Sequence, residues 1–258
     1  MTRLVCWFFI EQIRNIIDGQ PMGLEKTALI PLSVRNVADG SRSSPEDRLQ
    51  PAPARAQFEE LFAGSEDAGA TGFVLARIPA GRPVLWVSDR MSVSQMGQPY
   101  DLGLRRFSVD PGQLLLVCAN QATDVLWTME EALKCSSLGA VIGEIWGNPK
   151  VLDFTSTKRL AVRAERSATH TFLIRYAAAE ALSAARRRWR VKPLPSMPHP
   201  LDGHAPGPPR WRTTLFRARD TRPGEWVAQY EQQTHHLGFS PPFCDSAMAE
   251  TYGRQPGG

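Results

Sequence analysis

"QLLLVCANQATDVLWTMEEALKCSSLGAVIGEI", residues 113–145, holds the pattern that decides the fold. Two short apolar runs, 113–118 and 138–145, flank a segment at 123–135 whose apolar residues recur at helical spacing. Continuous apolar runs of this length are typical of strands that are buried on both faces of a sheet. A strand, a helix and a second strand in this order predict two parallel strands joined by a crossover helix.

The same alternation continues on both sides of this unit. Residues 83–88 and 171–176 are further short apolar runs, and 155–167 has the charge pattern and N-terminal residues of a helix. We therefore predict an α/β fold, with a mostly parallel twisted sheet flanked by helices. The segments "RRWRVKP", "RWRTTLFRAR" and "EWVAQYE" alternate in the manner of strands, and we expect them to add antiparallel strands at the C-terminal edge of the sheet.

The segments outside this pattern suggest the organisation of the chain. We expect an N-terminal helical segment at 1–38 and a flexible linker at 39–56, which is rich in Ser, Pro and Arg. The core is expected at 57–232, interrupted at 193–210 by a loop with seven prolines. Residues 233–258 are expected to form a disordered tail.

Composition limits the classes of function. The chain has 258 residues, of which 42% are hydrophobic, and a net charge of +4. It contains no apolar run of eighteen residues and no secretory signal, so we expect a cytoplasmic protein with no membrane partner. The four cysteines are scattered and the histidines lack metal spacing, which predicts reduced thiols and no metal site.

The charge is unevenly distributed. Between Ser183 and Arg222 ten basic side chains face two acidic ones, so this stretch carries +8 and the remainder of the chain carries −4. A basic stretch of this kind is consistent with a polyanionic partner, and equally with a solvated rim.

One loop resembles a phosphate-binding loop. In "GSEDAGATGF", residues 64–73, the small residues Gly64, Gly69 and Thr71 take the places of the glycines and the hydroxyl in G-x-x-x-x-G-K-[ST], but Ala70 replaces the lysine. That lysine supplies a fixed positive charge to the β- and γ-phosphates. We expect no required cofactor, although the loop could still bind ATP and Mg²⁺ weakly.

Glu144 closes the apolar run 138–145, where a carboxylate could hold Mg²⁺ through water. It could equally be a charge that simply ends the strand at the carboxyl edge of the sheet. With the loop, it completes a candidate nucleotide site of five residues, namely Gly64, Gly69, Ala70, Thr71 and Glu144.

Together these segments resemble the ImuA family, in its alphaproteobacterial form, within the RecA superfamily. The resemblance runs from about Phe58 to Tyr230 and includes "GRPVLWV", "SAARRRWRVKPLPS" and "PPRWRTTLFRARDTRPGEWVAQY". It implies a RecA-like core in which the loop matches Walker A and Glu144 matches the Walker B acid. It also implies that Arg217 and Arg219 reach a phosphate or the nucleotide of an adjacent subunit.

The ImuA resemblance implies an SOS-type, damage-induced accessory protein of error-prone translesion synthesis. Its partners would be a Y-family polymerase-like hub protein of the ImuB type and an error-prone replicative-type polymerase, with self-association as a further expectation. Because Ala70 supplies no charge, we expect a non-catalytic adaptor. The alternatives are a weak DNA-dependent ATPase of the recombinase type and a SulA-like cell-division inhibitor.

Single-stranded DNA is the expected polyanion. The candidate contacts are the arginines of the basic stretch, namely Arg186, Arg187, Arg188, Arg190, Arg210 and Arg212. Trp189 and Trp211 could provide stacking platforms for bases, or could instead belong to the core of the sheet.

Overall fold

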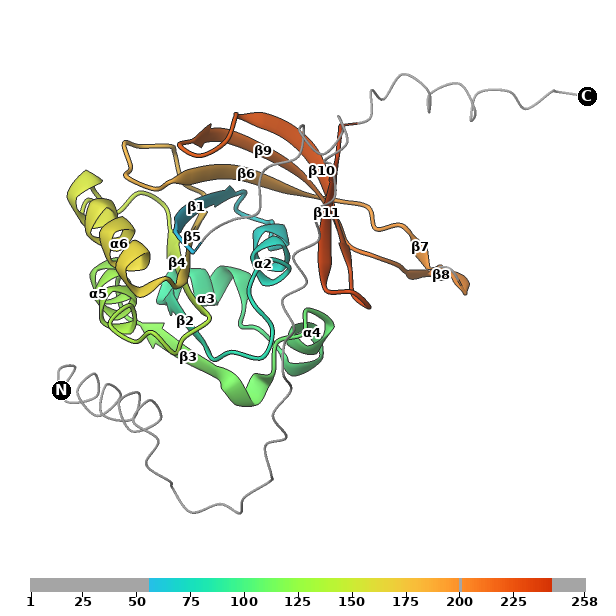
Figure 1. Ribbon diagram of the computed structural model, residues 1–258, viewed down its shortest axis with the longest axis horizontal. Coiled ribbons are helices and arrows are strands. Elements are labelled where there is room, and N and C mark those ends of the chain that lie inside the picture. Colours follow the sequence, from blue (N-terminus) through green and yellow to red (C-terminus); the bar gives the residue numbers. More distant parts are fainter. Residues whose placement is uncertain (1–55, 200, 243–258) are drawn as a thin grey trace, which may run out of the picture. The chain divides into compact units, whose positions relative to one another are not determined.

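A computed structural model describes residues 56–199 and 201–242 of the chain (Figure 1). The predicted N-terminal segment 1–38 lies outside these residues, as do nearly all of the linker and the tail beyond 242. The elements are β1 (Phe58–Ala63), α2 (Gly69–Leu75), β2 (Val84–Asp89), α3 (Arg90–Met96), α4 (Asp101–Arg106), the 3-10 helix η2 (Pro111–Gln113), β3 (Leu114–Ala119), α5 (Ala122–Ala132), β4 (Ala140–Trp146), α6 (Phe154–Ser167), β5 (His170–Tyr176), β6 (Arg187–Leu194), β7 (Pro198–His199), β8 (Asp202–Pro206), β9 (Arg210–Ala218), β10 (Gly224–Glu231) and β11 (His236–Ser240).

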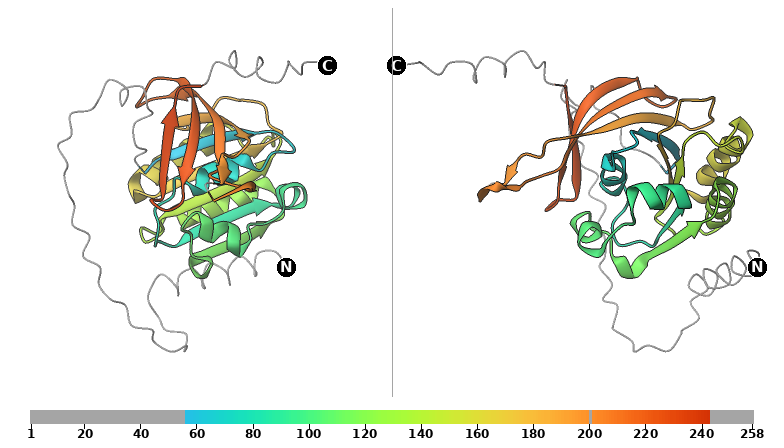
Figure 2. Two further views of the ribbon diagram at one scale, coloured as in Figure 1. Left: turned by 90° about the vertical axis from the view of Figure 1, so that its right-hand side faces the viewer. Right: turned by 180° about the vertical axis from the view of Figure 1, so that it is seen from behind.

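Nine of the strands form one sheet, in the order β11-β10-β9-β6-β1-β5-β4-β2-β3. Neighbours from β6 to β3 pair in parallel, whereas β6, β9, β10 and β11 pair with one another antiparallel. Helices α5 and α6 cover one face of the parallel part, and α2 and α3 lie on the other (Figures 1 and 2). The predicted fold class is confirmed, and the arrangement is consistent with a RecA-like core.

The predicted parallel strands appear where the apolar runs lie. The runs at 83–88, 138–145 and 171–176 become β2, β4 and β5, which are buried almost throughout. The run at 113–118 becomes β3, but this strand forms the edge of the sheet, and every residue in it except Ala119 is half-buried or exposed. Its apolar composition alone could not distinguish an edge strand from a central one.

An aromatic cluster joins the antiparallel strands to α2. Trp189 and Trp211 lie beside Phe73, with ring centroids 5.6 Å and 6.0 Å from it, and Phe239 of β11 lies 6.4 Å from Trp189. Trp189 and Trp211 are both buried. They therefore belong to the core of the sheet, and neither is available as a stacking platform.

Two predicted irregular segments contain strands. Within 193–210, β7 and β8 form a two-stranded ribbon. Beside it, the Met197 N–H donates to the carbonyl of Pro208 and the Gly207 N–H donates to the carbonyl of Met197, so these bonds require no proline N–H. Within 233–258, β11 pairs with β10 and satisfies its outer edge.

No helix in residues 56–199 or 201–242 has the length and apolar character needed to cross a membrane.

Candidate functional site

The predicted phosphate loop connects β1 to α2, which is the strand-to-helix context that such a loop requires. Helix α2 begins at Gly69 and has only seven residues. Its N-cap position is occupied by Ala68, whose side chain cannot accept a hydrogen bond from the helix. The segment before the loop, "FEELFA", is a strand at the centre of the sheet, between β5 and β6. The loop therefore has the correct topology but is followed by a very short helix.

The loop is closed by one of its own carboxylates. An oxygen of Asp67 accepts a hydrogen bond of 2.6 Å from the backbone N–H of Gly69, at the start of α2. Burial raises the pKa of Asp67 above its ordinary value, while the Gly69 N–H and the charge of Lys192 oppose the shift. A negative side chain thus occupies the position in which backbone N–H groups would otherwise face a phosphate.

Ala70, at the place of the lysine, points into the protein. Its side chain is fully buried and belongs to the hydrophobic core that also contains Phe73, Val74 and Trp189. A longer side chain at this position would enter the core and could not reach the surface of the loop without a shift of α2. The loop therefore lacks the direction of the lysine side chain as well as its charge.

Thr71 and Glu144 are linked through a tyrosine. Tyr176 donates its single hydroxyl proton to Oε1 of Glu144 at 2.9 Å, so in the 2.9 Å contact between the hydroxyls of Thr71 and Tyr176 the Thr71 hydroxyl is the donor. The Ser88 hydroxyl donates to Oε2 of Glu144 at 2.6 Å. The four side chains come from α2, β5, β4 and β2, and they form one chain of hydrogen bonds across the carboxyl ends of the strands.

Glu144 is a buried carboxyl group that forms no ion pair with any residue of the part of the chain that the structure describes. Only 3% of the residue is exposed, and burial raises its pKa above the ordinary value of 4.5, against the hydrogen bonds from Ser88 and Tyr176. The indole N–H of Trp86 also lies near enough to favour the charged form, yet it lacks hydrogen-bond geometry to any described residue. Burial and the charge of Glu144 raise the pKa of Tyr176 as well, so its hydroxyl stays protonated.

Asp89, at the end of the neighbouring strand β2, has a structural task. One oxygen accepts a hydrogen bond of 2.7 Å from the Ser92 N–H and caps α3, and the other accepts 3.0 Å from the Trp146 N–H. These bonds hold α3 and the end of β4 in place, beside Glu144. The nearby charge of Asp89 further raises the pKa of Glu144.

Two of the arginines expected to bind DNA lie inside the protein, and the prediction that they form a surface is wrong for both. Arg187 donates to Asp220 at 2.7 Å, and Arg188 donates to Glu60 at 2.9 Å. Each arginine is at most 5% exposed. The alternation put Arg188 on the face opposite Trp189, but it could not show that the arginine would be buried there against Glu60.

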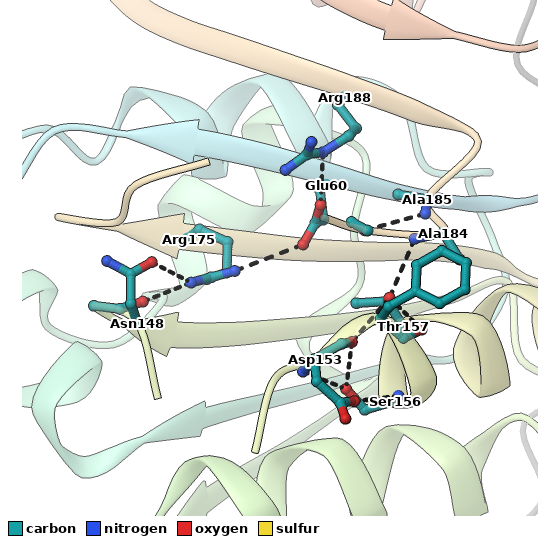
Figure 3. A network of polar contacts seen from close by, with 12 residues as sticks. Glu60, Asn148, Asp153, Ser156, Thr157, Arg175, Ala184, Ala185 and Arg188 are labelled. Carbon is teal, nitrogen blue, oxygen red and sulfur yellow. Dashed lines mark hydrogen bonds and ion pairs between the residues drawn. The ribbon is translucent and has the colours of Figure 1, made fainter. Parts of the chain in front are cut away.

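Glu60 is shared by two buried arginines, as Figure 3 shows. Its second oxygen lies 3.6 Å from Nη1 of Arg175, which also donates to the carbonyl of Gly147 and to Oδ1 of Asn148. On the opposite face of the same strand, Glu59 accepts two hydrogen bonds of 2.8 Å from Arg77 and one of 2.7 Å from the indole N–H of Trp189. Adjacent glutamates are thus neutralised on both faces of β1.

The other candidate arginines are at or near the surface. Arg190 and Arg212 have side chains that are 48% and 44% exposed, and they pair with Glu180 and Glu225. Arg210 donates to the carbonyl of Pro195, and Arg186 pairs with Glu165 of α6. Arg217 and Arg219 are both exposed, and their proposed contact with a phosphate or a neighbouring subunit stays a prediction.

Four cationic side chains, three of them exposed and that of Arg210 half-buried, share one face of the antiparallel strands. Lys192 of β6 lies directly opposite Arg212 of β9, and Arg190 and Arg210 stand two residues from these positions on the same strands. Side chains two apart on a strand point to the same side. This face is the outward one, because Trp189 and Trp211 point inward.

A cavity of about 1090 Å³ lies next to the hydrogen-bonded chain. Thr71, Trp86 and Glu144 contribute to its lining, together with the aromatic side chains of Tyr100, Phe107 and Tyr230. The ribbon β7–β8 and the segment after β10 supply the remaining wall, including His199 and Pro206.

Sequence reasoning missed three residues of the site. Asp67 stands two residues before Gly69, a spacing at which Asp commonly accepts a backbone N–H and closes a turn. Tyr176 is the last residue of β5 and Glu144 lies two residues before the end of β4, so both belong to the carboxyl edge of the parallel sheet. Ser88 precedes Asp89 at that edge, and no local signal indicated that it would bond to Glu144.

The chain is similar to two curated proteins. No protein-family model matches the chain. Two curated proteins of Caulobacter vibrioides, from strains NA1000 / CB15N and ATCC 19089 / CIP 103742 / CB 15, are each described as Protein ImuA and are 30% identical to it over 165 residues. The match covers 60% of this chain and 63% of each relative, which is less than two thirds of their length. With a fold that is consistent with a RecA-like core, this similarity supports the assignment of the chain to the ImuA family.

Proposed function

We propose that the protein is a non-catalytic, RecA-like accessory factor in damage-induced, error-prone translesion DNA synthesis. It engages a Y-family polymerase-like hub protein and an error-prone replicative-type polymerase, and it acts in the cytoplasm. The similarity to Protein ImuA supports a role in damage-induced mutagenesis, and the partners are those that the family resemblance implies.

One observation carries the non-catalytic part of this proposal: the side chain at position 70 is buried in the core. Asp67 covers the start of α2, and the Thr71 hydroxyl is engaged by Tyr176. A phosphate would therefore meet the Asp67 carboxylate, and position 70 would supply no positive charge. Because phosphoryl transfer depends chiefly on preorganised positive charge, efficient hydrolysis is not expected of this loop.

We further propose that single-stranded DNA runs along the outward face of β6 and β9. Arg190, Lys192, Arg210 and Arg212 supply its positive charge, with Arg186 at the margin. Glu180 and Glu225 neutralise part of this charge, so binding should be weak and dominated by phosphate contacts.

The test is a salt titration of single-stranded DNA binding by fluorescence anisotropy, with and without Mg-ATP. The expected result is a salt-dependent affinity that ATP does not change. Replacing both Arg190 and Arg212 with Ala should flatten the slope of log K against log salt by about 1.4, since each lost phosphate contact removes about 0.7 for a single strand. Arg159→Ala on α6 is a matched control, and it should leave the slope unchanged.

An affinity that rises with ATP, accompanied by ATP turnover, would favour the DNA-dependent ATPase. Absence of DNA binding in both conditions would remove DNA from the proposal and leave protein partners alone. Binding of the purified chain to the division-ring GTPase, with no binding to the hub protein, would favour the SulA-like inhibitor.

A further inference from the structure

The buried carboxyl of Glu144 lacks a counter-charge. Within residues 56–199 and 201–242, no ion pair includes Glu144 or its neighbour Asp89. By contrast, the two buried glutamates of β1 each have an arginine within 2.9 Å. A buried carboxylate that has only neutral donors is costly to maintain, so the exception at Glu144 requires an explanation.

Glu144 lines the large cavity and can accept more hydrogen bonds. Ser88 and Tyr176 each donate one bond, to different oxygens. An ionised carboxylate offers about four acceptor positions, so capacity remains on the side of the cavity. The basic side chains that line the cavity form no ion pair with Glu144: Arg106 is exposed on α4, and His199 belongs to the ribbon.

The walls of the cavity suit an organic cation. Trp86 lies in the lining beside Glu144, and Tyr100, Phe107 and Tyr230 line it further out. Aromatic faces attract ammonium and guanidinium groups and also pack against apolar stems. A phosphate in this cavity would instead meet the carboxyl groups of Glu144 and Glu231, which repel it when they are ionised.

We propose that this cavity binds a lysine or arginine side chain presented by an apolar segment of a partner protein, with Glu144 as its counter-ion. The ammonium or guanidinium group donates to the carboxylate, and the aromatic walls enclose the stem and the flanking apolar residues. A metal ion is a poorer fit, because the described residues contain no group of three or more His, Cys, Asp or Glu side chains that could hold one. The inference does not depend on the translesion role or on the identity of the partner.

The first test compares two small probes of equal shape. The full chain is titrated with benzylamine and with benzyl alcohol, and binding is followed by ligand-observed NMR. Benzylamine should bind about tenfold more tightly, since a hydrogen bond to a charged group is the stronger kind. Glu144→Gln should remove this preference, whereas Glu131→Gln, at a half-buried position of α5 outside the lining of the cavity, should retain it.

A second variant guards against a folding defect in Glu144→Gln. Tyr100 is 66% exposed, so Tyr100→Ala should fold normally and weaken benzylamine several-fold through loss of one aromatic wall. Equal binding of the two probes to the natural protein overturns the proposal. So does displacement of benzylamine by MgCl2 at constant ionic strength, which would identify a metal site.

The source of the cation is tested with peptides. Acetyl-Leu-Lys-Leu-amide should bind more tightly than benzylamine and at least tenfold more tightly than acetyl-Leu-Gln-Leu-amide. Binding of benzylamine without binding of the lysine peptide would contradict a protein partner and point to a free amine.

Discussion

The hydroxyl of Tyr176 lies 2.9 Å from Oε1 of Glu144 and donates a hydrogen bond to it. Tyr176 also bonds to Thr71 at the start of α2, so it connects the loop part of the candidate nucleotide site to Glu144 of β4. The positions that resemble Walker A and Walker B thus form a closed polar chain. The contribution of these hydrogen bonds to the unfolding free energy of the protein depends on whether Glu144 is protonated.

Glu144→Gln should stabilise the protein increasingly as pH rises. The folded-state pKa of Glu144 is raised by burial, so the folded protein holds this proton more firmly than the unfolded chain does. The natural protein therefore loses stability as pH rises from the ordinary value of 4.5 toward the raised one, by at most about 1.4 kcal/mol per pH unit. The amide of the Glu144→Gln variant does not titrate, so it contributes no such pH dependence. The hydroxyls of Ser88 and Tyr176 can rotate to donate to its oxygen or to accept from its NH2 group.

Urea unfolding of both proteins between about pH 4 and 8 checks this prediction, because the other carboxyl groups cancel in the difference. The difference in unfolding free energy should grow in favour of the variant up to the raised pKa and then level off. A difference that does not change with pH would show that Glu144 is not protonated more easily in the folded state.

Ala70→Lys should destabilise the protein without creating an ATP site. The new side chain would have to enter the core that surrounds Ala70, and overpacking alone typically costs about 1–3 kcal/mol, with the burial of a charge in addition. Ala68→Lys, at an exposed position of the same loop, is the control and should change stability little. Unfolding free energy and binding of a fluorescent ATP analogue are measured for both. If Ala70→Lys were as stable as the natural protein and bound ATP, the loop would lack only its charge.

Strand β1 shows where the sequence stops being informative. The runs that become β2, β4 and β5 are apolar throughout, and composition was enough to predict them. "FEELFA" carries adjacent glutamates and fits a helical turn as well as a strand. What allows both carboxylates to be buried is Arg77 on one face and Arg188 on the other, which are 18 and 128 residues away. Pairings over such distances leave no local trace.

The same limit applies to the candidate site. Spacing located the loop, and strand ends located Glu144, because both are local features. The direction of the Ala70 side chain and the contacts of Tyr176 depend on how α2 packs on the sheet. The arginine surface was predicted from alternation alone, which assigns a face but cannot tell a solvated guanidinium from one that lies over a buried carboxylate.

Arg188→Ala should destabilise the protein far more than Arg190→Ala. The first substitution leaves Glu60 buried with only Arg175 at 3.6 Å, and breaking a buried pair typically costs about 3–5 kcal/mol. Arg190 pairs with Glu180 at the surface and lies over Phe216, 4.4 Å from the ring centroid. Its removal should cost about 1 kcal/mol. Urea unfolding of both variants decides the matter, and similar small losses would mean that Arg188 is not held by Glu60 in solution.

Trp189→Phe should cost about 1–3 kcal/mol more than Trp211→Phe. Both tryptophans are buried in the aromatic cluster, so both substitutions remove a similar volume. Only Trp189 donates to a buried carboxylate, with its Nε1 2.7 Å from an oxygen of Glu59, and a hydrogen bond to a charged group is worth about that amount. Unfolding free energies of the two variants are compared under the same conditions.

The extra loss of stability caused by Trp189→Phe should shrink when Glu59 is also replaced with Gln, because a neutral amide is less costly to leave without the indole N–H than a carboxylate is. An undiminished loss in the double variant would assign the effect to packing, and the neutralisation of Glu59 would then rest on Arg77 alone.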